Sequence, residues 1–183
     1  MTSRLRAFWM ASVLALPLAG CELGRIAPAD ITGLRSFDGG ATVYVLTFPA
    51  VKVIVSSGME DRTVAHFDVT GFVGRVPPLS LTIPVDNMDE GDPAGDFEVY
   101  LFAGDGVVSA DEWDAGRLLH TFEDLEGGFQ VLELDVTDLV QIAVDRGFPF
   151  VSFGFRALED RFSLGASFGV PGETRLVVRV PDA

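Results

Sequence analysis

The densest group of residues that could do chemistry in this 183-residue chain is acidic. The stretch between Arg75 and Arg117 contains no lysine, arginine or histidine. Ca²⁺ takes six to eight carboxylate and carbonyl oxygens in a flexible geometry. Two turns, near residues 86–96 and 104–114, therefore predict a single calcium site at an edge of the domain, with a pair of solvated acidic loops as the alternative. The predicted ligands are Asp86, Asp89, Glu90, Asp92, Asp105, Asp111, Glu112 and Asp114.

The second of these turns carries part of a known calcium-binding pattern. Residues 105–112 resemble the second half of an EF-hand loop, with an acid, a glycine, an apolar residue and a closing glutamate. The first half of that loop is absent, because Leu101 and Ala103 stand where the first acidic ligands belong. Trp113 follows directly. We expect its ring either to stack on a sugar or to close one end of the domain.

Nucleophilic and zinc chemistry have weaker support. Residues 165–169 read Gly-Ala-Ser-Phe-Gly, which matches the G-x-S-x-G elbow around a hydrolase serine. That elbow needs a following helix and a later histidine, yet only 14 residues follow Gly169 and none of them is histidine. The histidines, His66 and His120, are far apart in the sequence, whereas a zinc site needs about three protein ligands. We therefore interpret both histidines as structural.

Short strands are expected to position these residues. Apolar residues alternate with others along residues 79–85, 97–103, 151–157 and 176–180, which is the period of half-buried strands. Further candidate strands cover residues 41–48, 51–57, 62–70 and 129–134. Glycine- and proline-containing turns separate them. The pattern predicts an all-β, two-sheet sandwich of the jelly-roll kind.

One segment departs from this alternation. Apolar residues recur at helical spacing from Leu139 to Ala143, so we predict one short helix over residues 137–146, with Thr137 or Asp135 as its cap. The residues just before it repeat an earlier sequence. Residues 67–73 and 134–140 are identical at four of seven positions, including Asp-Val-Thr. We interpret the repeat as a reused turn at the exit of a strand.

The only cysteine, Cys21, lies where an export signal would end. Two arginines open the chain and an apolar run follows over residues 7–18, too short for a stable membrane span. The run ends in Leu18-Ala19-Gly20-Cys21, which closely resembles the lipobox of bacterial lipoprotein signal peptides. The resemblance implies removal of residues 1–20 and lipidation of Cys21, which would anchor the chain to a membrane. It also accounts for a thiol with no second cysteine to pair with.

The domain organisation follows from that boundary. Residues 21–30 are expected to form a tether and residues 31–183 one domain. Without residues 1–20 the chain carries 11 basic and 27 acidic residues, a net charge near −16. Such a surface repels nucleic acid, so we expect no nucleic-acid partner.

A second resemblance bears on function. The order of Phe67-Asp68-Val69-Thr70, the 79–85 strand, Leu134-Asp135-Val136-Thr137 and the closing 175–178 strand resembles DNRLRE-type jelly-roll domains of secreted bacterial proteins. Those domains are similar to carbohydrate-binding modules, which implies a non-catalytic sandwich that binds a glycan. We therefore expect an exported lipoprotein, at the outer rather than the inner membrane, with a binding role. A polysaccharide hydrolase and a structural subunit of an envelope complex are the alternatives.

Overall fold

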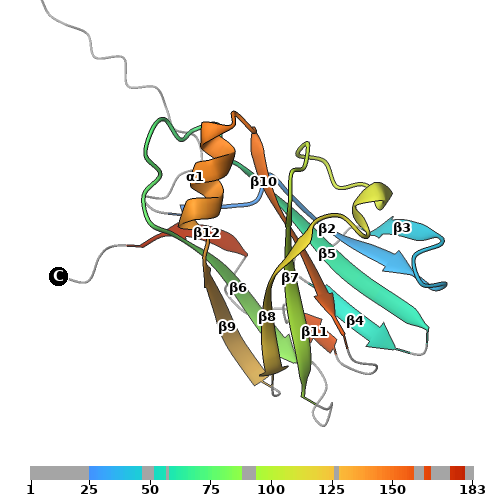
Figure 1. Cartoon of the computed structure of the whole chain (residues 1–183). Coiled ribbons are helices and arrows are strands. Elements are labelled where there is room, and N and C mark those ends of the chain that lie inside the picture. The colour runs from blue at the N-terminus through green and yellow to red at the C-terminus, as the bar shows by residue number, and fades with distance from the viewer. Residues whose placement is uncertain are drawn as a thin grey trace, which may run out of the picture.

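The computed structural model describes residues 25–46, 52–56, 58–87, 94–125, 128–158, 163–165 and 174–179. These residues form short strands, one helix and one turn of 3₁₀ helix (Figure 1). None of the helices in these ranges is long and apolar enough to cross a membrane. The elements are β1 (Arg25–Ile26), β2 (Asp30–Ser36), β3 (Val43–Leu46), β4 (Lys52–Ser56), β5 (Met59–Asp68), β6 (Leu79–Asn87), β7 (Gly95–Phe102), η1 (Ala110–Glu112), β8 (Arg117–Leu125), β9 (Gly128–Asp135), α1 (Thr137–Asp145), β10 (Phe150–Ala157), β11 (Ser163–Gly165) and β12 (Arg175–Val178).

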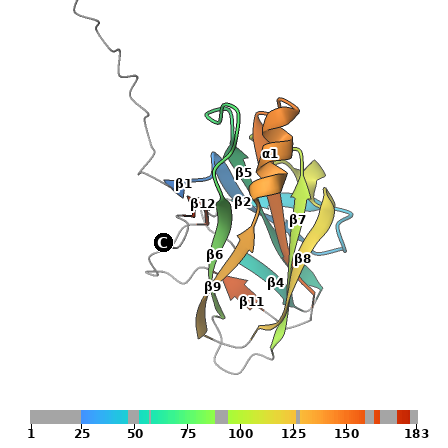
Figure 2. The ribbon, with the colours of Figure 1, turned by 60° about the vertical axis from the view of Figure 1, so that its left-hand side comes forward.

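The strands pack as a two-layered antiparallel sandwich, which confirms the predicted fold class (Figures 1 and 2). One layer runs β3–β2–β5–β10–β7–β8, and the other contains β1, β12, β6 and β9. Strand β4 pairs with β5 of the first layer. Strand β11 pairs with both β4 and β6, so hydrogen bonding continues from the first layer into the second. Figures 1 and 2 both show α1 at one end of the sandwich.

The predicted alternation identifies the core correctly. On β6 and β10 every second residue is buried between the layers, as period-two strands require. Edge-to-face packing joins Phe67 to Phe153, with ring centroids 5.9 Å apart. The buried alternating residues of β6, β7 and β10 are Leu79, Leu81, Ile83, Val85, Phe97, Val99, Val151, Phe153, Phe155 and Ala157.

The predicted helix is also present, as α1, and it begins where the repeated Asp-Val-Thr sequence ends. Val136 holds the N-cap position, while Asp135 Oδ1 accepts bonds from the Thr137 amide at 3.0 Å and hydroxyl at 2.7 Å. Asp68 does the same for Thr70, at 2.8 and 2.6 Å. The repeat is therefore a reused strand-exit turn, as predicted, and it leads into a helix only once.

Some strands were not predicted. Strand β8 is an edge strand whose pairing with β7 shifts register twice, and such irregularities break the alternation by which strands are recognised. Strand β2 contains Gly33 and mixes polar with apolar residues. Strand β1 begins at Arg25 and pairs with β12, so ordered pairing starts inside the segment expected to be a tether.

Candidate functional site

The candidate site lies on the outer face of the β5–β10 pair. His66 on β5 and Ser152 on β10 are directly opposite each other in the antiparallel register, and Phe102 on β7 is the next partner of Ser152. Their chain neighbours Phe67 and Phe153 point into the core between the layers. Because side chains alternate along a strand, His66 and Ser152 point away from that core.

The segment from Ala103 to Gly116, which contains η1, covers this outer face. Both His66 and Ser152 are 0% exposed as a result. Gly104 packs directly on them, since a Cβ atom there would overlap the His66 ring and the Ser152 hydroxyl. The backbone of Gly104 therefore forms part of the roof over both side chains.

His66 is held in one orientation, with one ring nitrogen at hydrogen-bond distance from Ser152 and the other in a longer contact with Glu112. Its Nδ1 lies 2.7 Å from Ser152 Oγ, within hydrogen-bond distance. Its ring makes edge contacts with Phe102 and Phe150, at centroid distances of 6.0 and 6.5 Å. Its Nε2 is buried and makes no hydrogen bond. A buried polar atom without a hydrogen bond normally costs about 1–3 kcal/mol, and the 3.3 Å contact with the Glu112 carboxylate offsets part of that cost.

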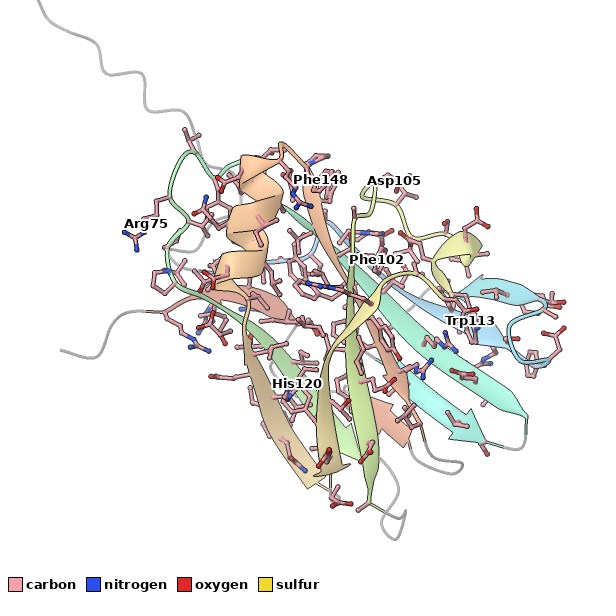
Figure 3. All side chains as sticks on the ribbon, viewed as in Figure 1. Arg75, Phe102, Asp105, Trp113, His120 and Phe148 are labelled. Atoms are coloured by element: carbon pink, nitrogen blue, oxygen red, sulfur yellow. The ribbon has the colours of Figure 1, made fainter. Side chains whose placement is uncertain are left out.

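Two carboxylates of the covering segment lie close to the His66 ring. Glu112 Oε2 lies 3.3 Å from His66 Nε2 and accepts a bond from the Ser109 amide at 3.1 Å. Burial raises the pKa of Glu112, and the Ser109 amide and His66 oppose that shift. Asp105 is exposed and accepts a bond from the Val107 amide at 3.0 Å. Figure 3 shows Asp105 at the start of the covering segment, above Phe102.

These three side chains form a possible metal centre. Within the described ranges, His66, Asp105 and Glu112 are the one group of three such residues whose ligand atoms could hold an ion, and those atoms lie within 4.8 Å of one another. Tetrahedral zinc with bonds of about 2.0–2.2 Å places two ligand atoms roughly 3.3–3.6 Å apart. A movement of about an ångström, most easily by exposed Asp105, would bring the ligands to that spacing. Ser152 would then fix the ring as the outer partner of a metal-bound histidine.

Ser152, His66 and Glu112 also follow one another in space in the order of a catalytic triad, which consists of a nucleophile, a base and an acid. Such a serine must meet a substrate carbonyl, and Ser152 is fully buried beneath Gly104. The arrangement therefore does not fit nucleophilic catalysis in this conformation.

The predicted calcium ligands do not all come together in the structure. Asp105 and Glu112 come together, but Asp111 is exposed outside the group, and Asp114 pairs with Arg62 at 2.9 Å. Asp86 lies near the end of β6, paired with Phe129 and Gly165, whereas Asp105 follows the opposite end of β7 from the turn that comes after β6. Figure 1 likewise shows the end of β6 far from η1. A single site shared by both turns is therefore not formed by these two residues. Asp89, Glu90 and Asp92 lie outside the described residues.

Trp113 lies in a packed position. Its side chain is 5% exposed, and the Arg62 guanidinium sits 4.1 Å from the ring centroid. The cavity beside it measures about 60 Å³, compared with roughly 300–1,000 Å³ for typical ligand pockets. The ring packs with Leu34, Val64 and Val108 on the outer face of the sheet, so this geometry matches neither an exposed sugar platform nor a ring that closes one end of the domain.

Sequence reasoning named Asp105 and Glu112 but missed His66 as their partner. The missing information was contact between residues about 40 to 46 positions apart, which only the strand register and the covering segment supply. A usable signal was present, because His66 is a polar residue between the apolar residues Ala65 and Phe67. Cys21 and Ser167 lie outside the described residues.

Comparison with known proteins finds no matching family model and no matching curated protein. The site is therefore interpreted from its own geometry.

Proposed function

We propose that this protein is a lipid-anchored envelope protein whose β-sandwich binds a divalent transition-metal ion, without catalysis. The observation that carries the proposal is the grouping of the buried His66 ring with the carboxylates of Asp105 and Glu112, in which Nε2 makes no hydrogen bond and lies 3.3 Å from Glu112 Oε2. A cation among the three side chains would replace this long contact with direct bonds. It would also neutralise two acids in a strongly acidic chain.

The donor set favours zinc or a similar ion over calcium. Calcium prefers sets made only of oxygen, whereas one imidazole with carboxylates suits zinc and its neighbours. The exposed side of Asp105 supplies a route of entry for the ion. Calcium remains the alternative ion, and direct comparison of the two ions separates the hypotheses.

Metal-assisted hydrolysis is the second candidate function. Three protein ligands with a fourth position for water is the usual arrangement of catalytic zinc. The complete burial of His66 favours binding over hydrolysis, because a substrate must reach the metal-bound water. Zinc-dependent cleavage of an envelope polysaccharide, lost in Glu112→Gln, would favour the hydrolase instead.

The direct test is thermal unfolding of the purified full chain in EDTA, zinc or calcium at matched ionic strength. Zinc at ten times its dissociation constant should stabilise the fold by about 1.4 kcal/mol, a rise of a few degrees in Tm. Glu112→Gln should abolish the rise. Asp111→Asn is the matched control, since Asp111 is an adjacent exposed acid outside the group, and it should retain the rise. Coincident curves in EDTA and zinc would contradict the proposal.

The lipid anchor has its own test. The Leu18-Ala19-Gly20-Cys21 sequence motivates the proposal that Cys21 carries the lipid. Cys21→Ser should therefore leave the sandwich folded but abolish incorporation of labelled fatty acid into the protein. Equal labelling of the variant and the unmodified protein would refute lipidation at this residue, whatever the outcome for metal binding.

A further inference from the structure

A second concave region is lined by α1 and by the adjoining ends of β7 and β10, and it includes Phe102 and Phe150, whose rings also contact His66. It has a volume of about 460 Å³, within the range of about 300–1,000 Å³ typical of ligand pockets. Its walls are mainly apolar, and Ile142 and Phe148 leave 47% and 42% of their surfaces exposed. Figure 3 shows Phe102 and Phe148 on the side of α1 opposite Arg75.

Two free cations border this apolar groove. Most described arginines are engaged by an acid or another group, as in Arg35 with Asp61 and Arg156 with Glu98. Among the described arginines, Arg75, Arg117 and Arg146 have no ion pair or side-chain hydrogen bond, and the last two line the groove. Arg146 is the C-cap of α1, where the helix dipole favours a cation, but that explanation does not extend to Arg117 on β8.

We propose that this groove binds a long-chain fatty carboxylate, with its hydrocarbon chain against α1 and Phe148 and its head at Arg117 and Arg146. Charge complementarity selects this occupant. The chain as a whole is strongly acidic, so two unpaired guanidiniums beside an apolar groove mark a local preference for an anion. Guanidinium binds carboxylate through paired hydrogen bonds, and the apolar walls match an acyl chain. The inference does not depend on the proposed metal site.

The test is photo-crosslinking of the full chain in phosphatidylcholine vesicles with a diazirine analogue of a sixteen-carbon fatty acid. Peptide mapping should place the cross-links in residues 139–151 and 101–103. The double variant Arg117→Gln/Arg146→Gln should reduce that labelling by about tenfold or more, the usual effect of losing charge-assisted hydrogen bonds. Arg75→Gln is the matched control, an unpaired arginine outside the groove, and should label normally.

A second probe isolates the role of the charge. The corresponding fatty alcohol carries the same diazirine and chain but no carboxylate, so it should label the groove weakly in the unmodified protein. Equal labelling by acid and alcohol would overturn the proposal. Cross-links outside the groove, or equal losses in Arg75→Gln and the double variant, would also overturn it.

Discussion

The two faces of the β5–β10 pair differ sharply although they alternate along the same strands. On the inner face, Phe67 and Phe153 are fully buried and pack edge to face in the main core. On the outer face, His66 and Ser152 are equally buried but polar, and one His66 nitrogen has no hydrogen-bond partner. Burial is therefore not what distinguishes the faces. The inner face needs only shape and apolar area, whereas the outer face keeps a buried imidazole beside the carboxylate of Glu112.

This contrast explains why the covering segment carries acids. A segment serving only to exclude water would gain most from apolar side chains, as Val108 and Trp113 supply in the small outer cluster. Asp105 and Glu112 instead face His66 from the same segment. The outer face thus joins a small apolar cluster, which holds the segment down, to a polar group that we interpret as a metal centre.

The largest expected effect comes from the inner face. Phe153→Ala should lower the free energy of unfolding by about 3–5 kcal/mol, because it removes a fully buried ring. Urea unfolding measures this change. Phe129→Ala is the matched control, since the Phe129 ring is largely exposed on β9 and its removal should cost far less. Equal losses in the two variants would contradict the assignment of Phe153 to the core.

The packing of the covering segment on His66 and Ser152 can be disrupted by substitution of Gly104. Gly104→Ala would push a methyl group into His66 and Ser152, and overpacking of this kind costs about 1–3 kcal/mol. We also expect zinc affinity to fall, because the ring must move. Gly71→Ala provides the comparison, as nothing lies within 4 Å of the added atom there. Unfolding curves and zinc titration calorimetry should separate the two variants, and identical behaviour would argue against a close roof.

The smallest effect on stability is expected at Ser152, where substitution separates a structural role of the outer face from a role in metal binding. Ser152→Ala removes the partner of His66 Nδ1 and should cost about 1–2 kcal/mol in stability. Its larger effect should be on zinc affinity, which falls about 10–100-fold when the outer partner of a metal-bound histidine is lost. A purely structural role would lower stability without altering zinc affinity. Calorimetric titration at a temperature where both proteins are folded distinguishes these outcomes.

Much of this architecture could be predicted from the sequence, for a physical reason. In half-buried strands apolar and polar residues alternate, and this pattern predicts β6, β7 and β10 together with the residues that they bury. The reused Asp-Val-Thr turn was also predictable, because its hydrogen bonds are local. Irregular strand β8 was not, since its register shifts disrupt the alternating pattern.

The site was predictable only in part. Local spacing singled out Asp105 and Glu112, but it placed them with acids from the turn before β7, at the other end of that strand. Their actual neighbour, His66, joins them through pairing between distant strands and the fold of the covering segment. Contacts between distant strands produce no periodic pattern in a single sequence. For this reason the sequence led to the interpretation of His66 as structural.

Metal binding at His66 is tested most directly by the NMR response of the histidine ring nitrogens to zinc in the full chain. The protein has two histidines, and His120 is exposed on β8, so it serves as an internal control. We predict that His66 Nε2 acquires a metal-bound chemical shift while Nδ1 keeps its proton, bonded to Ser152, and that His120 is unchanged. An unaltered His66 resonance at saturating zinc, or equal responses from both histidines, would contradict a metal centre at His66.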